Sequence, residues 1–318
     1  MTTENKTNIP SVAVVGGANM DIGGQSFQPL ILSDSNPGRV RISPGGVGRN
    51  IAHNLVLLGL PVRLIAAFGD DLYAQNILNS CRKLGIDTQE SIRIPGEMTS
   101  TYLYLADHTG EMHLAVSDME ICRFLTPEAL QERLACIQNA SALILDTNIP
   151  AETIAWLCEN AGIPVFADPV SVSKAEKLRP VLSRLHTLKP NRLEAELLTG
   201  IRIIDDGSLN RAADALLEKG LHQIFITLGK DGVLAADREE RLRLSALPEV
   251  PVNTTGSGDA FMAALVWAYL RGLGVQASAC AGLAAAAIAM ADSETVNNAM
   301  CEALLIEKCG FMKTIQKG

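Results

Sequence analysis

The sequence lacks the features with which proteins usually bind nucleic acid. Its 318 residues include 27 Lys and Arg against 35 Asp and Glu, a formal net charge of −8 at pH 7, and only 4% are aromatic. No run of basic residues occurs, and no series of aromatic residues offers a surface on which bases could stack. Because a negative field repels a polyanion, we expect no polynucleotide partner.

Disulfide pairs, metal-binding spacings and membrane segments are also missing from the pattern. The 7 cysteines are odd in number and include no Cys-x-x-Cys pair, which is typical of reduced thiols in a cytoplasmic protein. The 5 histidines are isolated, so nothing indicates a zinc site. The polar stretch 1–10 lacks an apolar signal-peptide core, and the weakly polar stretch 277–291 is too short to span a bilayer. We therefore expect a cytoplasmic protein without a membrane partner.

Hydrophobic residues, by contrast, are abundant at 47% of the chain, enough for a sizeable core. Helical patterns occur throughout, and Thr126 with Pro127 begins one of them with an N-cap and a proline at the first position. Strands alternating with helices predict an α/β fold with a mostly parallel central sheet covered on both faces. The buried strands are expected at the apolar runs 12–15, 62–65, 142–145, 164–167 and 223–226.

Two segments break this alternation. Residues 100–116 predict a hairpin with its turn at 107–110, and the segment that follows Ile22 is rich in Gly, Ser and Pro. We interpret them as one small β appendage, formed from about 22–44 and 92–118, across one end of the body; ordinary surface hairpins are the alternative. With no internal repeat or linker, residues 1–318 are expected to form a single domain with this appendage.

The most informative pattern is Thr-Thr-Gly-Ser-Gly-Asp at 254–259, followed by an apolar helix. The amides of Gly256, Ser257 and Gly258 can turn toward an anion, and the start of a helix favours the same charge. Asp259 places a carboxylate in this cradle, which indicates a proton acceptor and hence phosphoryl transfer to a hydroxyl. The alternative is an Asp that only stabilises the helix dipole. A P-loop needs Lys after the second glycine and is excluded.

A second glycine cluster begins at Gly45 and Gly46 and precedes a helix that we expect over residues 51–58. Backbone without a Cβ lets a ligand approach closely. The Asn50 amide is able to bridge hydroxyls, or it simply caps the helix.

Three polar residues follow the ends of predicted strands: Asn19, Asp21 and Asn148. Ligands of open α/β sheets bind outside the carboxyl ends of the strands. We therefore regard these side chains as candidates for binding sugar hydroxyls. The alternative is that each is a turn residue bonded to the local backbone.

Two further patterns lie between residues 189 and 232. Asn191 and Glu194 are three apart at a predicted helix start, so they share a face and could hold hydrated Mg²⁺ near phosphate oxygens. On spacing alone, a capping box is favoured. Thr227, Gly229 and Gly232 leave room for a ring or a ribose beside the backbone, and a hairpin with an Asp-Gly turn explains them equally well.

In order and separation, these patterns resemble the ribokinase-like, or PfkB, family of carbohydrate and nucleoside kinases over essentially the whole chain. The resemblance implies a three-layer α/β sandwich with a β lid, and transfer of the γ-phosphoryl group of ATP to a hydroxyl. The matching motifs are Gly45-Gly46-x-x-x-Asn50, residues 253–259, Asn191-x-x-Glu194 and Thr227-x-Gly229-x-x-Gly232.

The resemblance also implies roles for single residues. Asp259 would accept the proton of the hydroxyl, while the amides of Gly256, Ser257 and Gly258 stabilise the developing charge. Glu194, with Asn191, would hold Mg²⁺ through water. The implied substrate-binding residues are Asn19, Asp21, Gly45, Gly46, Asn50, Thr101 and Asn148. The implied ATP-binding residues are Asn191, Thr227, Gly229, Gly232 and Asn297.

Two departures from the family pattern bear on its ions. Val47 stands where many ribokinases have Lys, which removes an ammonium from the vicinity of the sugar or phosphate. Asn253 replaces the usual Asp, which bears on the family's monovalent-cation site and hence on any use of K⁺. In relatives the lids often pair two subunits, so the resemblance implies a homodimer through the β lid.

The resemblance to a bacterial branch that acts on nucleosides is carried by residues 33–38, 45–52, 186–196 and 296–298. The substrate-binding candidates are mainly Asn and Asp, without cations for an existing phosphate, which favours a neutral polyol. We therefore expect a small-molecule nucleoside as the substrate. The rival readings are a kinase of the same family that acts on ribose, a sugar phosphate or a purine nucleoside, and a nucleoside sensor without catalysis.

Overall fold

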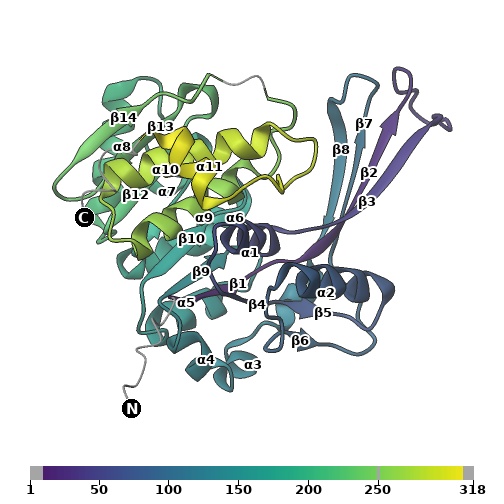
Figure 1. The fold of residues 1–318 in the computed structure, drawn as a ribbon, viewed down its shortest axis with the longest axis horizontal. Helices are drawn as coiled ribbons and strands as arrows, with labels where there is room; N and C mark the ends of the chain where they lie inside the picture. Colours follow the sequence, from purple (N-terminus) through teal and green to yellow (C-terminus); the bar gives the residue numbers. More distant parts are fainter. Residues whose placement is uncertain (1–9, 249–250, 311–318) are drawn as a thin grey trace, which may run out of the picture.

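The computed structural model describes residues 10–248 and 251–310 (Figure 1). A central sheet of eight strands runs in the order β14-β13-β12-β11-β10-β9-β1-β4, and its neighbours pair in parallel except where β13 joins β12 and β14. The five predicted strands and the mostly parallel α/β fold are confirmed. The strands are β1 (Val12–Val15), β4 (Val62–Ile65), β9 (Ala142–Asp146), β10 (Val165–Asp168), β11 (Thr187–Leu188), β12 (Gln223–Thr227), β13 (Val233–Ala236) and β14 (Arg241–Leu244).

Helices cover both faces of this sheet because its strands alternate between two hydrophobic cores. In β1, Val12 and Val14 belong to one core, and Ala13 and Val15 to the other. The first core takes side chains from α1 (Val47–Leu57), α2 (Leu72–Leu84), α9 (Ser257–Leu270), α10 (Val275–Met290) and α11 (Glu302–Cys309). The second takes them from η1 (Glu120–Phe124), α3 (Pro127–Gln131), α4 (Leu134–Gln138), α5 (Ala151–Asn160), α6 (Val172–Ala175), η2 (Glu176–Arg184), α7 (Arg192–Thr199) and α8 (Asp206–Glu218). The result is a three-layer sandwich.

Two helix starts test the sequence analysis. Thr126 caps α3 as predicted, because its side chain accepts a hydrogen bond from the Ala129 amide at 3.3 Å. The predicted start of the helix after the second glycine cluster is wrong. Helix α1 begins at Val47, because Gly46 has a φ of 100° and turns the chain directly into the helix. Asn50 therefore lies inside the first turn of α1 and is not its cap.

A second sheet of four strands projects from the body beside α1 and α2 (Figure 1). Its β7–β8 hairpin confirms the predicted one. We expected residues 92–100 to belong to this sheet, and this expectation is wrong. Residues 92–93 instead form β6 (Ile92–Arg93), which pairs with β5 (Ala67–Phe68). The sheet, which we call the β lid, has the order β3-β2-β7-β8 and consists of β2 (Asn19–Ser26), β3 (Gly38–Gly45), β7 (Thr101–Ala106) and β8 (Met112–Asp118).

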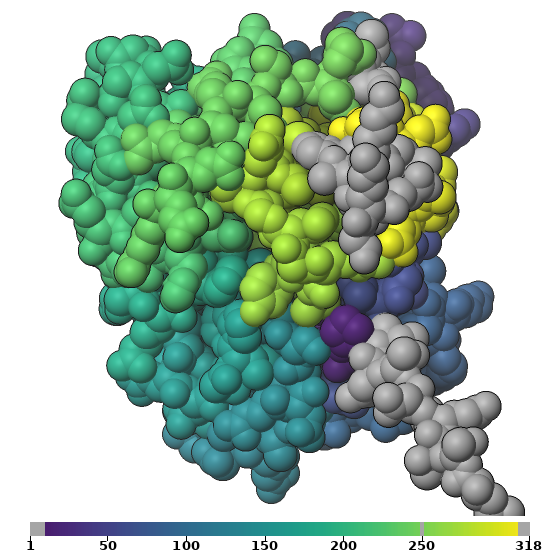
Figure 2. Space-filling model, turned by 60° about the vertical axis from the view of Figure 1, so that its left-hand side comes forward, coloured from purple at the N-terminus to yellow at the C-terminus, as the bar shows by residue number. Residues whose placement is uncertain are grey.

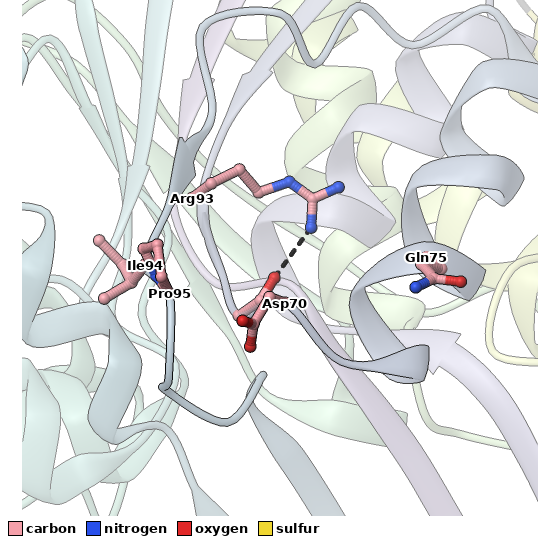
Figure 3. Close-up of a pocket in the computed structure, with 6 residues that line it drawn as sticks. Asp70, Gln75, Arg93, Ile94 and Pro95 are labelled. Atoms are coloured by element: carbon pink, nitrogen blue, oxygen red, sulfur yellow. Dashed lines mark hydrogen bonds between the residues drawn. The ribbon is translucent and has the colours of Figure 1, made fainter.

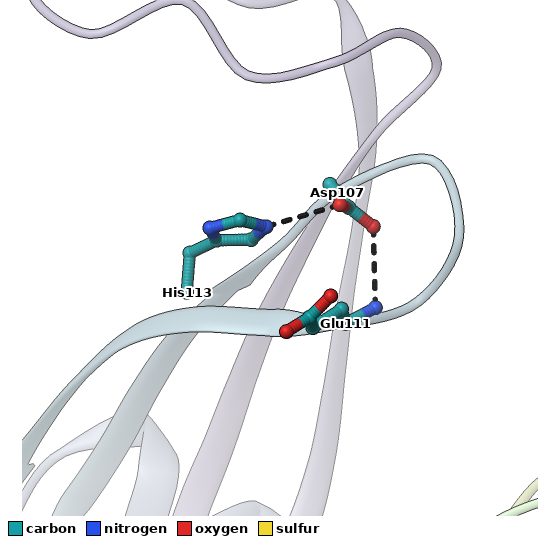
Figure 4. Close-up of side chains that lie close together, drawn as sticks. All are labelled: Asp107, Glu111 and His113. Carbon is teal, nitrogen blue, oxygen red and sulfur yellow. Dashed lines mark hydrogen bonds and ion pairs between the residues drawn. The ribbon is translucent and has the colours of Figure 1, made fainter.

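Three polar side chains lie close together at the tip of the β7–β8 hairpin (Figure 4). The Asp107 carboxylate accepts hydrogen bonds from the amides of Thr109 and Glu111, at 2.8 and 3.2 Å, and pairs with His113 Nε2 at 3.0 Å. The bond from the Thr109 hydroxyl and the pairing with His113 lower the pKa of Asp107. These bonds account for the cluster as the closure of a tight turn.

The most apolar helices, α9 and α10, pack against each other in the body. Within residues 10–248 and 251–310, no helix combines the length and the apolar character needed to cross a membrane. In Figure 2, the green part of the chain lies beside the yellow-green part on the face that is turned to the viewer.

Candidate active site

The carboxyl ends of the central strands bring together charged residues that are distant in sequence. Asp146 ends β9 and Asp168 ends β10, and the two are paired in register. Asp146 accepts hydrogen bonds from the amides of Gly17 and Asn148 at 2.7 and 2.9 Å, which fixes the loop after β1. Lys189 follows β11 and pairs with Asp168, with 3.1 Å between Nζ and Oδ2.

Asp259 lies in the first turn of α9, above these strand ends. Its Oδ2 accepts a 3.0 Å hydrogen bond from Asn50 Nδ2, so the two glycine motifs, 209 residues apart, meet at one carboxylate. Burial raises the pKa of Asp259 to about 8; the charge of Asp168 also raises it, whereas the Asn50 bond and Lys189 lower it. A carboxyl group with such a pKa is suited to accepting a proton near neutral pH.

The backbone before Asp259 turns into α9 at the glycines where we expect an anion cradle. Gly256 is the N-cap of α9 with a φ of 81°, and a Cβ there would collide with the Thr295 carbonyl, so only glycine fits. First-turn amides of a helix have no partner inside the helix. Those of Ser257 and Gly258 lie at the positive end of a 14-residue helix, where a phosphate is stabilised.

Four of the substrate-binding candidates meet where the β lid joins the body. Asn19 Nδ2 donates to Asp21 Oδ1 at 2.6 Å. Gly45 lies against the Asp21 carboxylate, where any Cβ would collide with it, and Gly46 is packed equally closely against the backbone at Gly17 and Ala18. Burial raises the pKa of Asp21, and the Asn19 bond and the charge of Arg49 oppose this rise.

Asn50 contacts Asp259, and the last two candidates, Asn148 and Thr101, do not contact Asp21 through their side chains. Asn148 Oδ1 accepts a 2.6 Å hydrogen bond from Lys174 Nζ, and the Asn148 amide group lies close to Gly17 at the end of β1. Thr101 begins β7 and is in register with Met20. Because side chains alternate along a strand, Thr101 lies on the face of the lid opposite to Asp21.

The side chains of Asn191 and Glu194 form the capping box that their spacing favours. Asn191 Oδ1 accepts from the Glu194 amide at 3.0 Å, and Glu194 Oε2 accepts from the Asn191 amide at 2.8 Å. Burial raises the pKa of Glu194. The box uses only one oxygen of the buried Glu194 carboxylate, so its Oε1 is able to accept from a water of a hydrated cation. The acidic surroundings, with Asp168 close by, also fit Mg²⁺.

The remaining ATP-binding candidates form two groups. Thr227 lies beside Asn191, since its amide donates to the Pro190 carbonyl at 2.9 Å. Gly229 and Gly232 have φ of 60° and 88° and flank η3 (Gly229–Asp231), the turn of the β12–β13 hairpin. Asn297 lies in the loop after α10, where its side-chain amide donates to the Ile288 carbonyl at 2.7 Å and accepts from the Ala299 amide at 2.9 Å, so both ends of this side chain hold the loop.

A cavity of about 290 Å³ lies away from Asp259, between the loop before α2 and the segment around β6 (Figure 3). Arg93 donates to the Gly69 carbonyl at 2.9 Å, which closes one side of it. None of the candidate residues lines this cavity, which is lined by Gly69, Asp70, Gln75, Arg93, Ile94 and Pro95. The candidate active site is therefore the region around Asp259, where the charged groups converge.

Comparison with known proteins agrees with this geometry. Residues 10–300 match the model of the pfkB family of carbohydrate kinases. The chain belongs to the pfkB family. Its members transfer a phosphoryl group to a hydroxyl group, as the sequence motifs predict for this pfkB kinase.

Several relatives resemble this pfkB kinase along most of its length. A pseudouridine kinase of Escherichia coli is 42% identical over 264 residues, which cover 82% of this chain and 84% of the relative. An uncharacterised sugar kinase of Escherichia coli is 39% identical over 90% of this chain and 79% of its own. The structure of Arabidopsis thaliana ribokinase has a TM-score of 0.83 at 21% identity, over 95% and 99% of the two chains, and shows that the fold is ribokinase-like.

Sequence reasoning missed three charged residues of this pfkB kinase site: Asp146, Asp168 and Lys189. Asp146 and Asp168 directly follow apolar runs, so the rule that selected Asn148 could have found them, whereas Lys189 follows the short strand β11, which no apolar run announces. Their charges matter because all three act on the pKa of Asp259.

Proposed function

We propose that this pfkB kinase phosphorylates the 5′-hydroxyl of pseudouridine with ATP, giving pseudouridine 5′-phosphate and ADP. A pseudouridine kinase is 42% identical to the chain. The four segments that resemble nucleoside kinases, residues 33–38, 45–52, 186–196 and 296–298, resemble those of bacterial pseudouridine kinase.

In this reaction the 5′-oxygen attacks the γ-phosphorus of ATP, a new O–P bond forms, and the bond to the bridging oxygen of ADP breaks. Asp259 takes the hydroxyl proton, and Asn50 holds the Asp259 carboxylate in place through their 3.0 Å contact. The amides at the start of α9 stabilise the charge that develops on the phosphoryl oxygens. Most of the catalysis is then positioning and charge stabilisation.

The ribose and the nucleotide would bind on either side of Asp259. Asn19 and Asp21 would bind the ribose diol, and Gly45 and Gly46 let the end of β3 pack closely against Asp21 and the loop after β1. The nucleotide would lie along the strand ends toward Thr227 and the β12–β13 hairpin. Glu194 and Asn191 would hold Mg²⁺ through water, and this ion would neutralise phosphate charge when bound.

The observation that supports a nucleoside as substrate is a pair of tyrosines on the Asp21 face of the lid. Asp21 is in register with Tyr102, and Gly23 with Tyr104, so all four share one face. Their rings have centroids 6.0 Å apart, and Gly23 lacks a Cβ where the Tyr104 ring lies across it. An aromatic surface beyond the diol-binding carboxylate offers a nucleobase a stacking platform, whereas ribose has no group to stack.

Pseudouridine and uridine differ in how the uracil ring is attached, and the C-linked isomer presents an additional ring N–H. A buried acceptor that meets this N–H would be left unpaired by uridine. That loss costs about 1–3 kcal/mol, or roughly 5- to 150-fold in discrimination. We therefore expect a higher kcat/KM for pseudouridine than for uridine, and a higher value for either than for ribose.

The alternative is a related sugar or nucleoside kinase, with ribose or a purine nucleoside as substrate. The 39% identity to a sugar kinase over 90% of the chain favours this alternative. With ribose as the substrate, the tyrosine pair would have no base to bind.

A homodimer through the β lid is part of the proposal. The lid face opposite Asp21 is apolar and exposed, which a soluble surface of this extent seldom is unless a partner covers it. The lid would then both exclude water from the reaction and pair two copies of the chain. We also propose a cytoplasmic location, which the free thiols of the described cysteines support. The register places on this face the exposed residues Val40, Ile42, Leu103, Leu105, Leu114 and Val116, together with Ile22, which is partly buried against the core.

The test is ADP release with ATP, Mg²⁺ and one acceptor at a time: pseudouridine, uridine, guanosine, inosine or ribose. The proposal predicts the highest kcat/KM with pseudouridine. Ribose equal to or better than pseudouridine overturns the substrate and leaves the kinase assignment intact. Nucleoside binding without ADP release would instead support the sensor.

A further inference from the structure

One charged group at the site has no role in the mechanism above: the ammonium of Lys189. Its side chain is buried, and Asp168 is its ion-pair partner, with Nζ 3.1 Å from Oδ2. An ammonium has three N–H donors. Among the described residues, the pair with Asp168 uses one of these N–H donors. The other two are able to bind an acceptor that enters the site.

The position of Gly258 shows where this ammonium points. A Cβ placed on Gly258 would lie 3.4 Å from Lys189 Nζ. Gly258 is in the first turn of α9, between the cradle amide of Ser257 and the proposed base Asp259. The Lys189 ammonium therefore borders the cradle from the side of the sheet, and a larger residue at 258 would lie between the ammonium and the cradle.

The charges around Lys189 keep it ionised in this buried place. Burial alone would lower its pKa, but the carboxylates of Asp168, Glu194 and Asp259 raise it above its ordinary value. Three carboxylates with a single nearby ammonium repel the triphosphate of ATP. A cation fixed at the cradle reduces that repulsion where the transferred group passes, and it is present before the substrate arrives.

We propose that Lys189 contacts the phosphoryl group during transfer and that Asp168 holds its ammonium in position. This inference rests on the proposed phosphoryl transfer. Lys189 remains protonated throughout: the hydroxyl proton goes to Asp259, and the leaving oxygen departs with ADP. Val47 cannot supply an ammonium from α1, and Lys189 supplies one from the end of β11.

The competing explanation is structural, since Lys189 and Asp168 also tie β11 to β10. Removal of one partner from a buried pair leaves an uncompensated charge and destabilises the fold. The experiment therefore uses Lys189→Met and the double variant Asp168→Asn/Lys189→Met, which removes both charges. Lys219→Met is the control for loss of a lysine. Lys219 is exposed at the end of α8, where it donates to the Leu198 carbonyl at 3.4 Å.

Two quantities separate the explanations: kcat at saturating substrates, and the affinity for ADP with aluminium fluoride and the acceptor, which mimics the transferring phosphoryl group. In both Lys189 variants we expect kcat to fall about 10²–10³-fold, the usual effect of losing one oxyanion donor. Binding of the fluoride complex should weaken comparably, while the affinity for ADP alone changes little. Lys219→Met should match the wild type.

A double variant that folds and keeps wild-type kcat overturns the inference. An equal loss of ADP and fluoride-complex affinity also overturns it, because a structural defect affects both alike. Wild-type turnover of ribose but not pseudouridine would reject the proposed substrate separately, and the Lys189 comparison would then be made with ribose as acceptor.

Discussion

Replacement of Asp259 by Asn removes the proposed proton acceptor and changes little else in shape. The contact with Asn50 at 3.0 Å can persist, because the amide oxygen of the substituted side chain still accepts from Asn50 Nδ2. Loss of a general base lowers kcat by about 10²–10⁴-fold, or ~3–5 kcal/mol of barrier. A residue that only stabilises the dipole of α9 would instead cost about 1 kcal/mol of stability and leave turnover intact.

The pKa of Asp259 gives this prediction a sign that can be checked against pH. Folding raises the pKa to about 8, above the unfolded value of about 3.9. The folded protein therefore favours the protonated form of Asp259. The free energy of unfolding falls as pH rises from about 4 through about 8, because the unfolded protein loses this proton first. Asp259→Asn should consequently be at least as stable as the wild type at pH 9, whereas wild-type kcat/KM should rise with pH until the base is ionised.

The assay is coupled ADP release at saturating ATP, with thermal melting at pH 5 and pH 9 as the control for folding. A variant that melts like the wild type but turns over at least 10²-fold more slowly, the lower bound for a lost general base, agrees with the mechanism. Near-normal turnover would refute it and return Asp259 to a role in helix stability.

Three further predictions concern the metal, the base platform and the lid. Glu194→Gln keeps the capping box, since Gln also serves at that position, so we expect an unchanged melting temperature with a lower rate and a raised Mg²⁺ requirement; unchanged Mg²⁺ dependence would leave the motif purely structural. Tyr104→Ala should raise KM for pseudouridine about 5- to 150-fold, the worth of stacking one base, without affecting ribose; equal effects on both would remove the platform. Leu103→Asp on the apolar lid face should give a monomer by light scattering while Ile204→Asp, also exposed, should not, and a wild-type monomer would reject the dimer.

The fold was accessible from the sequence because its strands are buried on both faces. Val12–Val15 is apolar at every position, since alternate residues face different cores, and such runs are hard to mistake. The start of α1 was missed because Gly46 and Gly48 look like loop residues. Their local pattern does not reveal that Gly48 packs closely against Gly16 and Asp146, a tertiary contact that permits a helix there.

The sequence predicts the parts of the candidate site that lie in a short motif. It does not predict the parts that depend on how strands pair or on contacts between distant residues. Gly256 to Asp259 could be identified locally, but the Asn50–Asp259 contact joins residues 209 positions apart. Thr101 was expected to bind the substrate as a polar residue of the predicted lid, whereas the register of β2 with β7 places Tyr102 beside Asp21 instead. A one-residue shift exchanges the two faces of a strand, and the sequence alone does not fix that register.

The central claim is transfer of a phosphoryl group from ATP to the 5′-hydroxyl of a nucleoside, and the position of the phosphate in the product tests it most directly. The enzyme, ATP and Mg²⁺ are incubated with pseudouridine, and the product is analysed by phosphorus–proton correlation NMR. The account predicts coupling of the phosphorus to the 5′ protons of the ribose. Coupling to the 2′ or 3′ proton, or no phosphorylated nucleoside at all while ribose is consumed, would contradict it.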